Sequence, residues 1–198
     1  MNKRTSLKVF VMGMLCFFVS QMVIRIPLLN YLNSNFLYSI FSTKHQILMG
    51  IFIPLSAGVF EECGRYIFKD KCLKSKGEFF EPIVFGLGHG LMEVAMILVS
   101  SVGVGKISTV ELTIGLYERV LAVIFHICMS VLVWRGFILD RKIKHLLIAI
   151  FIHFIFDYWI VLVNQFKINM FNTYLMWSVV DLLLIVYIFK VKENWRSE

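Results

Sequence analysis

The sequence predicts an all-α integral membrane protein, a single polytopic bundle of about six transmembrane helices. Of its 198 residues, 59% are hydrophobic and only 17% are charged, whereas soluble domains average roughly 45–50% and about 25%. Mean hydropathy is +0.78, and a chain of this size has too small an interior to hide so much apolar surface from water. We therefore expect residues 1–198 to form one domain whose solvent is lipid, in a bacterial cell membrane.

Six apolar stretches are long enough to cross the hydrocarbon core, which takes about 20 residues of α-helix. They cover approximately residues 7–29, 46–67, 80–102, 112–134, 144–163 and 174–190. The last stretch is the shortest and gives the weakest signal.

Basic residues gather in alternate connections between these stretches. If the N-terminus is cytoplasmic, fourteen Lys and Arg residues lie in inner segments and three in outer ones. The inner ones are Lys3, Arg4, Lys8, Lys69, Lys71, Lys74, Lys76, Arg135, Arg141, Lys142, Lys144, Lys190, Lys192 and Arg196, and the outer ones are Lys44, Lys106 and Lys167. This asymmetry predicts that both termini are cytoplasmic. The net charge of +7 is therefore assigned to loops at the membrane surface, and no nucleic-acid partner is expected.

Several ionisable side chains lie within the spans, where each costs several kcal/mol unless it is paired or hydrated. Such residues usually face the interior of the bundle and mark function. The ionisable residues that we assign to the bundle interior are Glu61, Glu62, Arg65, His89, Glu93, Glu118, Arg119, His126, His153 and Asp157. Arg25, near the outer end of the first span, is instead expected to extend its side chain to the membrane surface.

Three of the histidines are predicted to share one depth. His89, His126 and His153 lie about eight or nine residues from the cytoplasmic ends of their spans, roughly 13 Å at the rise of an α-helix. Glu61 and Glu62 lie about six residues from the cytoplasmic end of theirs, near 9 Å by the same rise. Side chains from four helices are therefore expected to meet on the cytoplasmic side of the bilayer midplane.

Helical spacing adds a supporting layer. His89 and Glu93, like His153 and Asp157, are four residues apart and share a face of their helix. We expect Glu93, Arg119 and Asp157 to lie deeper in the membrane and to support the histidines.

Three glycines, Gly86, Gly88 and Gly90, surround His89 in the sequence. In membranes, small residues allow a second backbone to come close. We expect these glycines to open room beside His89 for an extended substrate.

Three short motifs follow one another on separate spans. In order, they are Glu61-Glu62-x-x-Arg65, Phe85-x-x-x-His89 and His153-x-x-x-Asp157. Together they resemble the motifs of the CAAX protease and bacteriocin-processing superfamily, and the flanking residues, such as Gly-His-Gly-x-x-Glu, are most similar to its YhfC-type branch. The resemblance covers residues 55–160 approximately. This chain departs from the superfamily pattern by one residue fewer before Arg65 and by Asp157, where asparagine is frequent.

The resemblance implies a glutamate-type intramembrane endopeptidase that acts on a membrane-associated peptide or protein without a cofactor. Glu61 would be the general base that activates water, positioned by Glu62 and Arg65. His89 would share the water, and the His-Asp pair of the third motif would stabilise the oxyanion. Supporting roles fall to Glu93, Glu118, Arg119 and His126.

Other functions stay open on the residues alone. Zinc is one, held by His89, His126 and His153 together with a glutamate, because His and carboxylate ligands suffice for a catalytic site. A proton-coupled transporter or channel is another, because chains of Glu, His and Asp also relay protons. A third is a catalytically silent immunity or interaction protein on the same scaffold.

Overall fold

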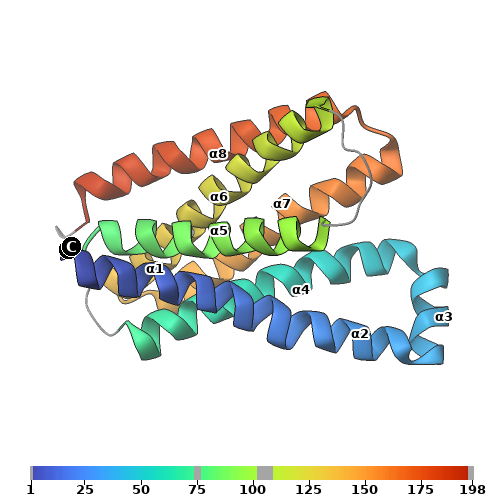
Figure 1. Cartoon of the computed structure of the whole chain (residues 1–198), viewed down its shortest axis with the longest axis horizontal. Coiled ribbons are helices and arrows are strands. Elements are labelled where there is room, and N and C mark those ends of the chain that lie inside the picture. The colour runs from blue at the N-terminus through green and yellow to red at the C-terminus, as the bar shows by residue number, and fades with distance from the viewer. Residues whose placement is uncertain (1, 74–76, 102–108, 196–198) are drawn as a thin grey trace.

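The computed structural model describes residues 2–73, 77–101 and 109–195, and these form helices with no strand among them (Figure 1). Six helical stretches of the described residues are long and apolar enough to cross a membrane. The predicted fold class is thus confirmed. Four residues of the charge analysis, Lys74, Lys76, Lys106 and Arg196, lie outside the described residues.

The six spans extend beyond the predicted apolar stretches at most ends. The first is continuous from α1 (Lys3–Phe17) through a π-helical segment, η1 (Phe18–Arg25), to α2 (Ile26–Ser34). The others are α4 (Gln46–Ile67) with η2 (Phe68–Cys72), α5 (Phe80–Ser101), α6 (Thr109–Ile138), α7 (Lys142–Phe166) and α8 (Met170–Glu193). Capping explains two of the starts, because the side chains of Asn2 and Asn169 accept from backbone N–H groups of the first turn.

An additional short helix, α3 (Phe36–Lys44), occupies the connection between the first two spans. Asn35 starts it by accepting from the N–H groups of Leu37 and Tyr38, at 3.0 and 3.2 Å. Phe36 is 74% exposed and Leu37 is 75% exposed. The helix lies at the end of the bundle opposite the termini (Figure 1), where apolar side chains can enter the membrane interface.

The centre of the bundle is α6. In its most apolar window 67% of the residues are buried, against 17–33% in the other spans. It contacts α5, α7 and α8, while α1 packs along α5 and α4 packs along α7. The helices α4, α5, α6 and α7 therefore pack around a common interior. Polar side chains that face this interior meet away from lipid.

The glycines beside His89 serve helix packing, so the expectation that they make room for a substrate is wrong. A Cβ on Gly88 would collide with the Phe10 carbonyl oxygen of α1, and one on Gly86 would lie 2.7 Å from the His126 carbonyl oxygen of α6. Gly90 also packs closely against α6. Small residues here let three helices approach at backbone distance.

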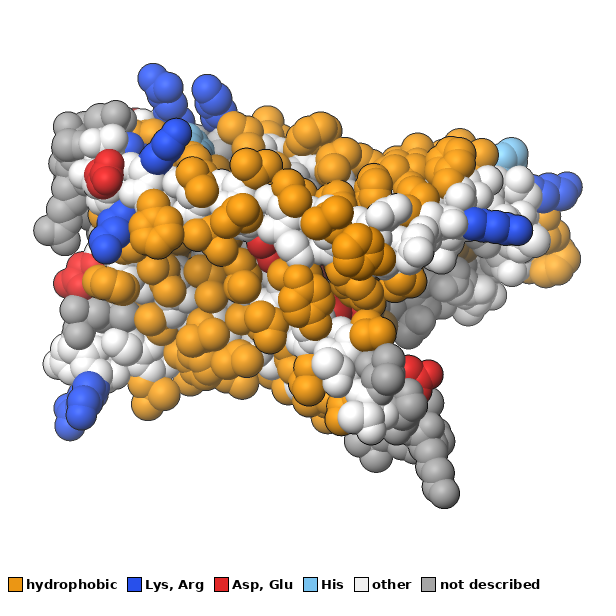
Figure 2. Space-filling view, turned by 90° about the horizontal axis from the view of Figure 1, so that it is seen from above, with side chains coloured by type: hydrophobic (Ala, Val, Ile, Leu, Met, Phe, Trp, Pro, Cys, Tyr) orange, Lys and Arg blue, Asp and Glu red, His pale blue; other side chains and the backbone are white. Residues whose placement is uncertain are grey.

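Charged and hydrophobic side chains occupy different parts of the molecular surface. Figure 2 shows hydrophobic side chains over the middle of the viewed face, with Lys and Arg at both ends and more of them at the left end. The N-terminal start of α1 and the C-terminus lie together at that same end (Figure 1). The first and last described helices therefore have their chain ends at the same end of the bundle, and the cytoplasmic location of both termini stays a prediction.

Candidate functional site

The α4 helix supplies two consecutive carboxylates. Glu61 is 5% exposed and Glu62 is fully buried. At 3.6 residues per turn, neighbouring side chains point in different directions. Glu61 therefore faces α5 and α6, whereas Glu62 faces α7.

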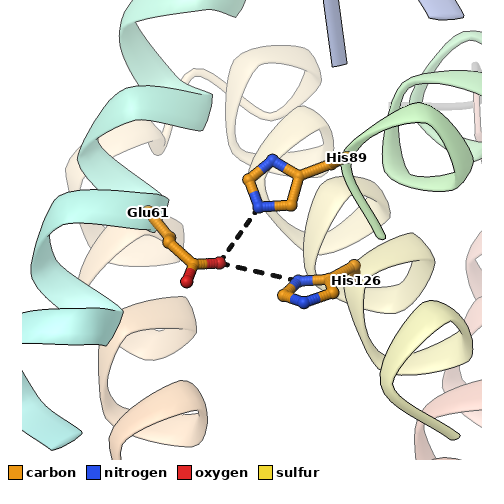
Figure 3. A group of neighbouring side chains, drawn as sticks. All are labelled: Glu61, His89 and His126. Carbon is orange, nitrogen blue, oxygen red and sulfur yellow. Dashed lines mark hydrogen bonds and ion pairs between the residues drawn. The ribbon is translucent and has the colours of Figure 1, made fainter. Parts of the chain in front are cut away.

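One oxygen of Glu61 is surrounded by three imidazoles. Glu61 Oε2 lies 3.0 Å from His89 Nε2, 3.8 Å from His126 Nδ1 and 4.0 Å from His153 Nε2. The first two contacts are drawn in Figure 3. The histidines come from α5, α6 and α7, so the structure brings together the three side chains that were predicted at one depth.

Arg65 is fully buried and ties this cluster to α6. Its Nη2 lies 3.1 Å from His126 Nδ1, and its Nη1 donates to the His126 carbonyl oxygen at 3.0 Å. Its Nε forms an ion pair with Glu62 Oε2 at 3.5 Å, and Nη2 is 4.0 Å from Glu61 Oε2. Because a guanidinium only donates, His126 Nδ1 must be the acceptor, and the proton of this ring is on Nε2.

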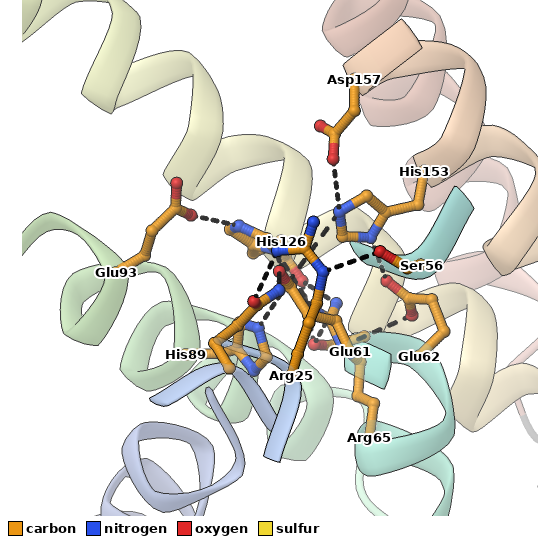
Figure 4. Close-up of polar contacts among 12 residues, drawn as sticks. Arg25, Ser56, Glu61, Glu62, Arg65, His89, Glu93, His126, His153 and Asp157 are labelled. Atoms are coloured by element: carbon orange, nitrogen blue, oxygen red, sulfur yellow. Dashed lines mark hydrogen bonds and ion pairs between the residues drawn. The ribbon is translucent and has the colours of Figure 1, made fainter. Parts of the chain in front are cut away.

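His153 joins the third motif to the first. Its Nδ1 is 2.7 Å from Glu62 Oε1, and its Nε2 is 3.6 Å from Asp157 Oδ2 (Figure 4). An ionised carboxylate only accepts, so His153 donates from Nδ1 to Glu62. Glu62 thus binds both Arg65 and His153 and orients these two side chains toward Glu61.

A further layer lies behind His126. Its Nε2 donates to Glu93 Oε2 at 2.5 Å, and Glu93 Oε1 accepts from Arg119 Nη1 at 3.1 Å. Arg119 also donates to Glu118. Glu93 shares a helix face with His89, as predicted from spacing, but its histidine partner is on the neighbouring helix.

The first span contributes residues that the sequence reasoning missed. Gln21 donates to Glu61 Oε1 and accepts from Arg25 Nη1, the latter at 2.9 Å. Arg25 also donates to Ser56 Oγ and to the Ile53 carbonyl oxygen, both at 3.0 Å. The expectation that Arg25 extends to the membrane surface is therefore wrong. The sequence offered only a weak signal for this contact, two polar residues four positions apart in a largely apolar span.

Two cavities meet at Glu61, Glu93 and Asp157. The larger, about 810 Å³, lies between the first span, α4, α5 and α7, and its walls are mostly apolar. The smaller, about 150 Å³, reaches from the histidines to Glu118 and Arg119. In Figure 2, acidic atoms are visible through gaps in the hydrophobic surface. The larger cavity therefore brings apolar walls to the carboxylates, whereas the smaller one connects them with His126, His153, Glu118 and Arg119.

The cluster also contains a ligand set that suits a metal ion. One ligand atom each from Glu61, His89 and His126 lie within 4.8 Å of one another. This group contains a glutamate and two of the three histidines that the sequence grouped as zinc ligands, and it does not include His153. His89 Nδ1 is buried, and no described residue forms a hydrogen bond with it.

Comparison with known proteins places this arrangement in a family. The family described as YhfC intramembrane metalloprotease matches residues 1–105 and 101–181. An uncharacterized membrane protein YhfC of Bacillus subtilis (strain 168) is 32% identical over 120 residues, which are 59% of this chain. The match spans only 45% of that relative's length. No solved structure matches. Most of the chain, including all three motifs, falls within the family match, and the protein therefore belongs to the YhfC intramembrane metalloprotease family.

Proposed function

We propose that this chain is a glutamate-type intramembrane endopeptidase that hydrolyses a peptide bond of a membrane-associated peptide or protein. One observation carries the proposal: Glu61 Oε2, buried within the bundle, lies within 4.0 Å of imidazoles from three different helices. Of this group, Glu61 also lines the cavity of about 810 Å³, so the carboxylate is reached from a space large enough for part of a substrate. The order of the motifs supports a place in the CAAX protease and bacteriocin-processing superfamily.

In this mechanism Glu61 accepts a proton from a water molecule at Oε2, and His89 Nε2 orients that water. General-base catalysis requires the base to lie within hydrogen-bond reach of the proton it removes. Gln21 and Arg65 hold the carboxylate in place from opposite sides. His153, when doubly protonated, donates Nδ1–H to Glu62 and is left with Nε2–H for the developing oxyanion.

A metal ion fits the same residues by ligand type. Glu61, His89 and His126 would hold it, since two imidazoles and a carboxylate form a catalytic zinc site. When bound, such an ion supplies a Lewis acid that makes water a nucleophile near neutral pH. Arg65 Nη2, however, lies 3.1 Å from His126 Nδ1, the ring nitrogen that faces Glu61. Because this hydrogen bond uses the Nδ1 lone pair that a metal ion would need, it favours a protease of the glutamate type.

The test is cleavage of apolar peptides by the purified protein in detergent or liposomes, followed by mass spectrometry of the products. Glu61→Gln and His89→Ala should each lower the rate by about 10²- to 10⁴-fold, the usual contribution of acid–base groups. Asp70→Asn is the matched control, because Asp70 pairs with Lys71 and Lys142 and not with a residue of the Glu61 cluster. Folding is checked by gel filtration and circular dichroism.

Other outcomes separate the alternatives. Activity that is lost to a chelator and restored by zinc would replace the glutamate type with a metal type at the same residues. Full activity of both Glu61→Gln and His89→Ala would remove this site from the mechanism. Proton flux in liposomes that depends on His126 and Glu93, without cleavage, would favour a transporter or channel. Normal biological activity after replacement of Glu61, His89 and His153 together would favour an interaction protein.

A further inference from the structure

Arg25 brings a positive charge without a direct ion pair among the described residues into the membrane-embedded part of the bundle. Three of the five N–H groups of a guanidinium are used, toward Gln21, Ser56 and the Ile53 carbonyl oxygen. These partners are neutral, and no carboxylate of residues 2–73, 77–101 and 109–195 forms an ion pair with Arg25. A charge within a transmembrane segment is costly and usually marks a site for a substrate or ion.

The position of Arg25 connects this charge with the reaction centre. Arg25 lines the cavity of about 810 Å³ and is its only basic residue among those described. Glu61, Glu93 and Asp157 line the same cavity, whose other walls include Met22, Met49 and Ile160. Cavities of this size hold ligands that are largely apolar and are oriented by a few polar groups.

Building on the proposed function, we propose that Arg25 binds a carboxylate of the substrate, so that the preferred substrate is an apolar peptide segment with one acidic residue near the scissile bond. A guanidinium with free N–H groups suits a carboxylate by charge and by geometry. The apolar walls accept the rest of the segment.

The spacing along α4 gives the expected position of the acidic residue. Ser56 and Ile53, which hold Arg25, lie five and eight residues from Glu61, or roughly 7–12 Å at the rise of an α-helix. An extended peptide covers about 3.3 Å per residue. The acidic residue therefore lies about two to four residues from the bond that Glu61 hydrolyses.

A purely structural role for Arg25 makes a different prediction. If Arg25 only tied the first span to α4 and held Gln21 against Glu61, its loss would slow the cleavage of all peptides alike. Such a general effect slows the cleavage of an acidic peptide and of the matching neutral peptide equally, so it cancels in the ratio of their rates. That ratio is the quantity to measure.

The first experiment uses pairs of apolar peptides that differ only by Asp or Asn, placed at each position up to four residues on either side of the cleaved bond. For the wild type, the ratio of kcat/KM between Asp and Asn should reach about tenfold or more at one position, the usual effect of a hydrogen bond to a charged group. Arg25→Gln should bring it close to one, and Arg25→Lys should give an intermediate value. Gln21→Leu should slow both peptides and leave the ratio unchanged.

The second experiment measures binding without turnover. Affinities of the same peptides for Glu61→Gln in liposomes should show the same preference for Asp, and the double variant with Arg25→Gln should lose it. Equal affinities for Asp and Asn peptides, or a preference that survives Arg25→Gln, would overturn the inference about Arg25. An Arg25-dependent preference without any cleavage by the wild type would retain the binding site and refute the proposed function.

Discussion

The Arg65 guanidinium lies 3.1 Å from His126 Nδ1 and thereby fixes which ring nitrogen of His126 carries the proton. The other nitrogen, Nε2, then donates to Glu93. Arg65 therefore orients the Glu61 cluster through His126 as well as through its own charge, although it resembles a simple partner of the Glu61-Glu62 pair in the sequence.

Arg65→Lys should lose both activity and stability. A lysine keeps the charge but cannot supply the several fixed N–H donors of a guanidinium, so Glu62 or His126 loses its partner. Breaking a buried ion pair costs about 3–5 kcal/mol. The measurement is thermal unfolding in detergent together with peptide cleavage. An Arg65→Lys protein with wild-type stability and rate would contradict the role given to this residue.

Arg65→Gln should bind zinc more tightly than the wild type does. The substitution frees the lone pair of His126 Nδ1 and removes a positive charge 4.0 Å from Glu61 Oε2, and both changes favour a cation at Glu61, His89 and His126. We expect about a tenfold difference or more, in the range by which groups around a metal site change its affinity. Isothermal titration with zinc measures it, and Arg65→Gln combined with His126→Ala is the control. Equal affinities would show that Arg65 does not compete with a metal.

Glu93→Gln should lower the rate of cleavage by about ten- to a hundredfold, because Glu93 orients His126 through Nε2. Glu118→Gln is the matched control, since Glu118 contacts Arg119 and not a histidine. It should retain most of the activity. The comparison is made by kcat/KM on one peptide, and a larger loss in Glu118→Gln than in Glu93→Gln would reverse the assignment.

The spans were predictable because the lipid core imposes a length and an apolar composition on each helix. The partners of the ionisable residues were less predictable. Sequence spacing relates residues on one helix, as for His89 and Glu93, but the hydrogen bond of Glu93 goes to His126 on α6. The role of Gln21 was not foreseen, because an uncharged amide gives little signal in an apolar span and because η1 is π-helical, which changes the direction of its side chains relative to an α-helix.

Orientation in the membrane rests on the charge count and gives a separate prediction. Fluorescent reporters that mature only in the cytoplasm should be bright when fused before Lys3 or after Lys192. The same reporter inserted after Lys44, at the end of α3, should be dark, because the connections on that side hold three basic residues against fourteen on the other. The reverse pattern of fluorescence would place Glu61 in the half of the bilayer away from the cytoplasm.

Glycines in a transmembrane helix can make room for a substrate or allow close helix packing, and the sequence alone does not distinguish the two. A stability measurement on glycine variants does. Gly88→Ala would place a methyl group against the Phe10 carbonyl oxygen, and forced overpacking of this kind costs about 1–3 kcal/mol. In Gly115→Ala, on α6, the added methyl group meets no described atom beyond the local helix backbone within 4 Å. This variant should be neutral or stabilising by up to about 1 kcal/mol, because alanine favours a helix. The midpoints of unfolding in a series of denaturing detergent concentrations compare the two variants. If Gly88→Ala is as stable as Gly115→Ala and only its cleavage of peptides is impaired, the space beside Gly88 belongs to the substrate and not to α1.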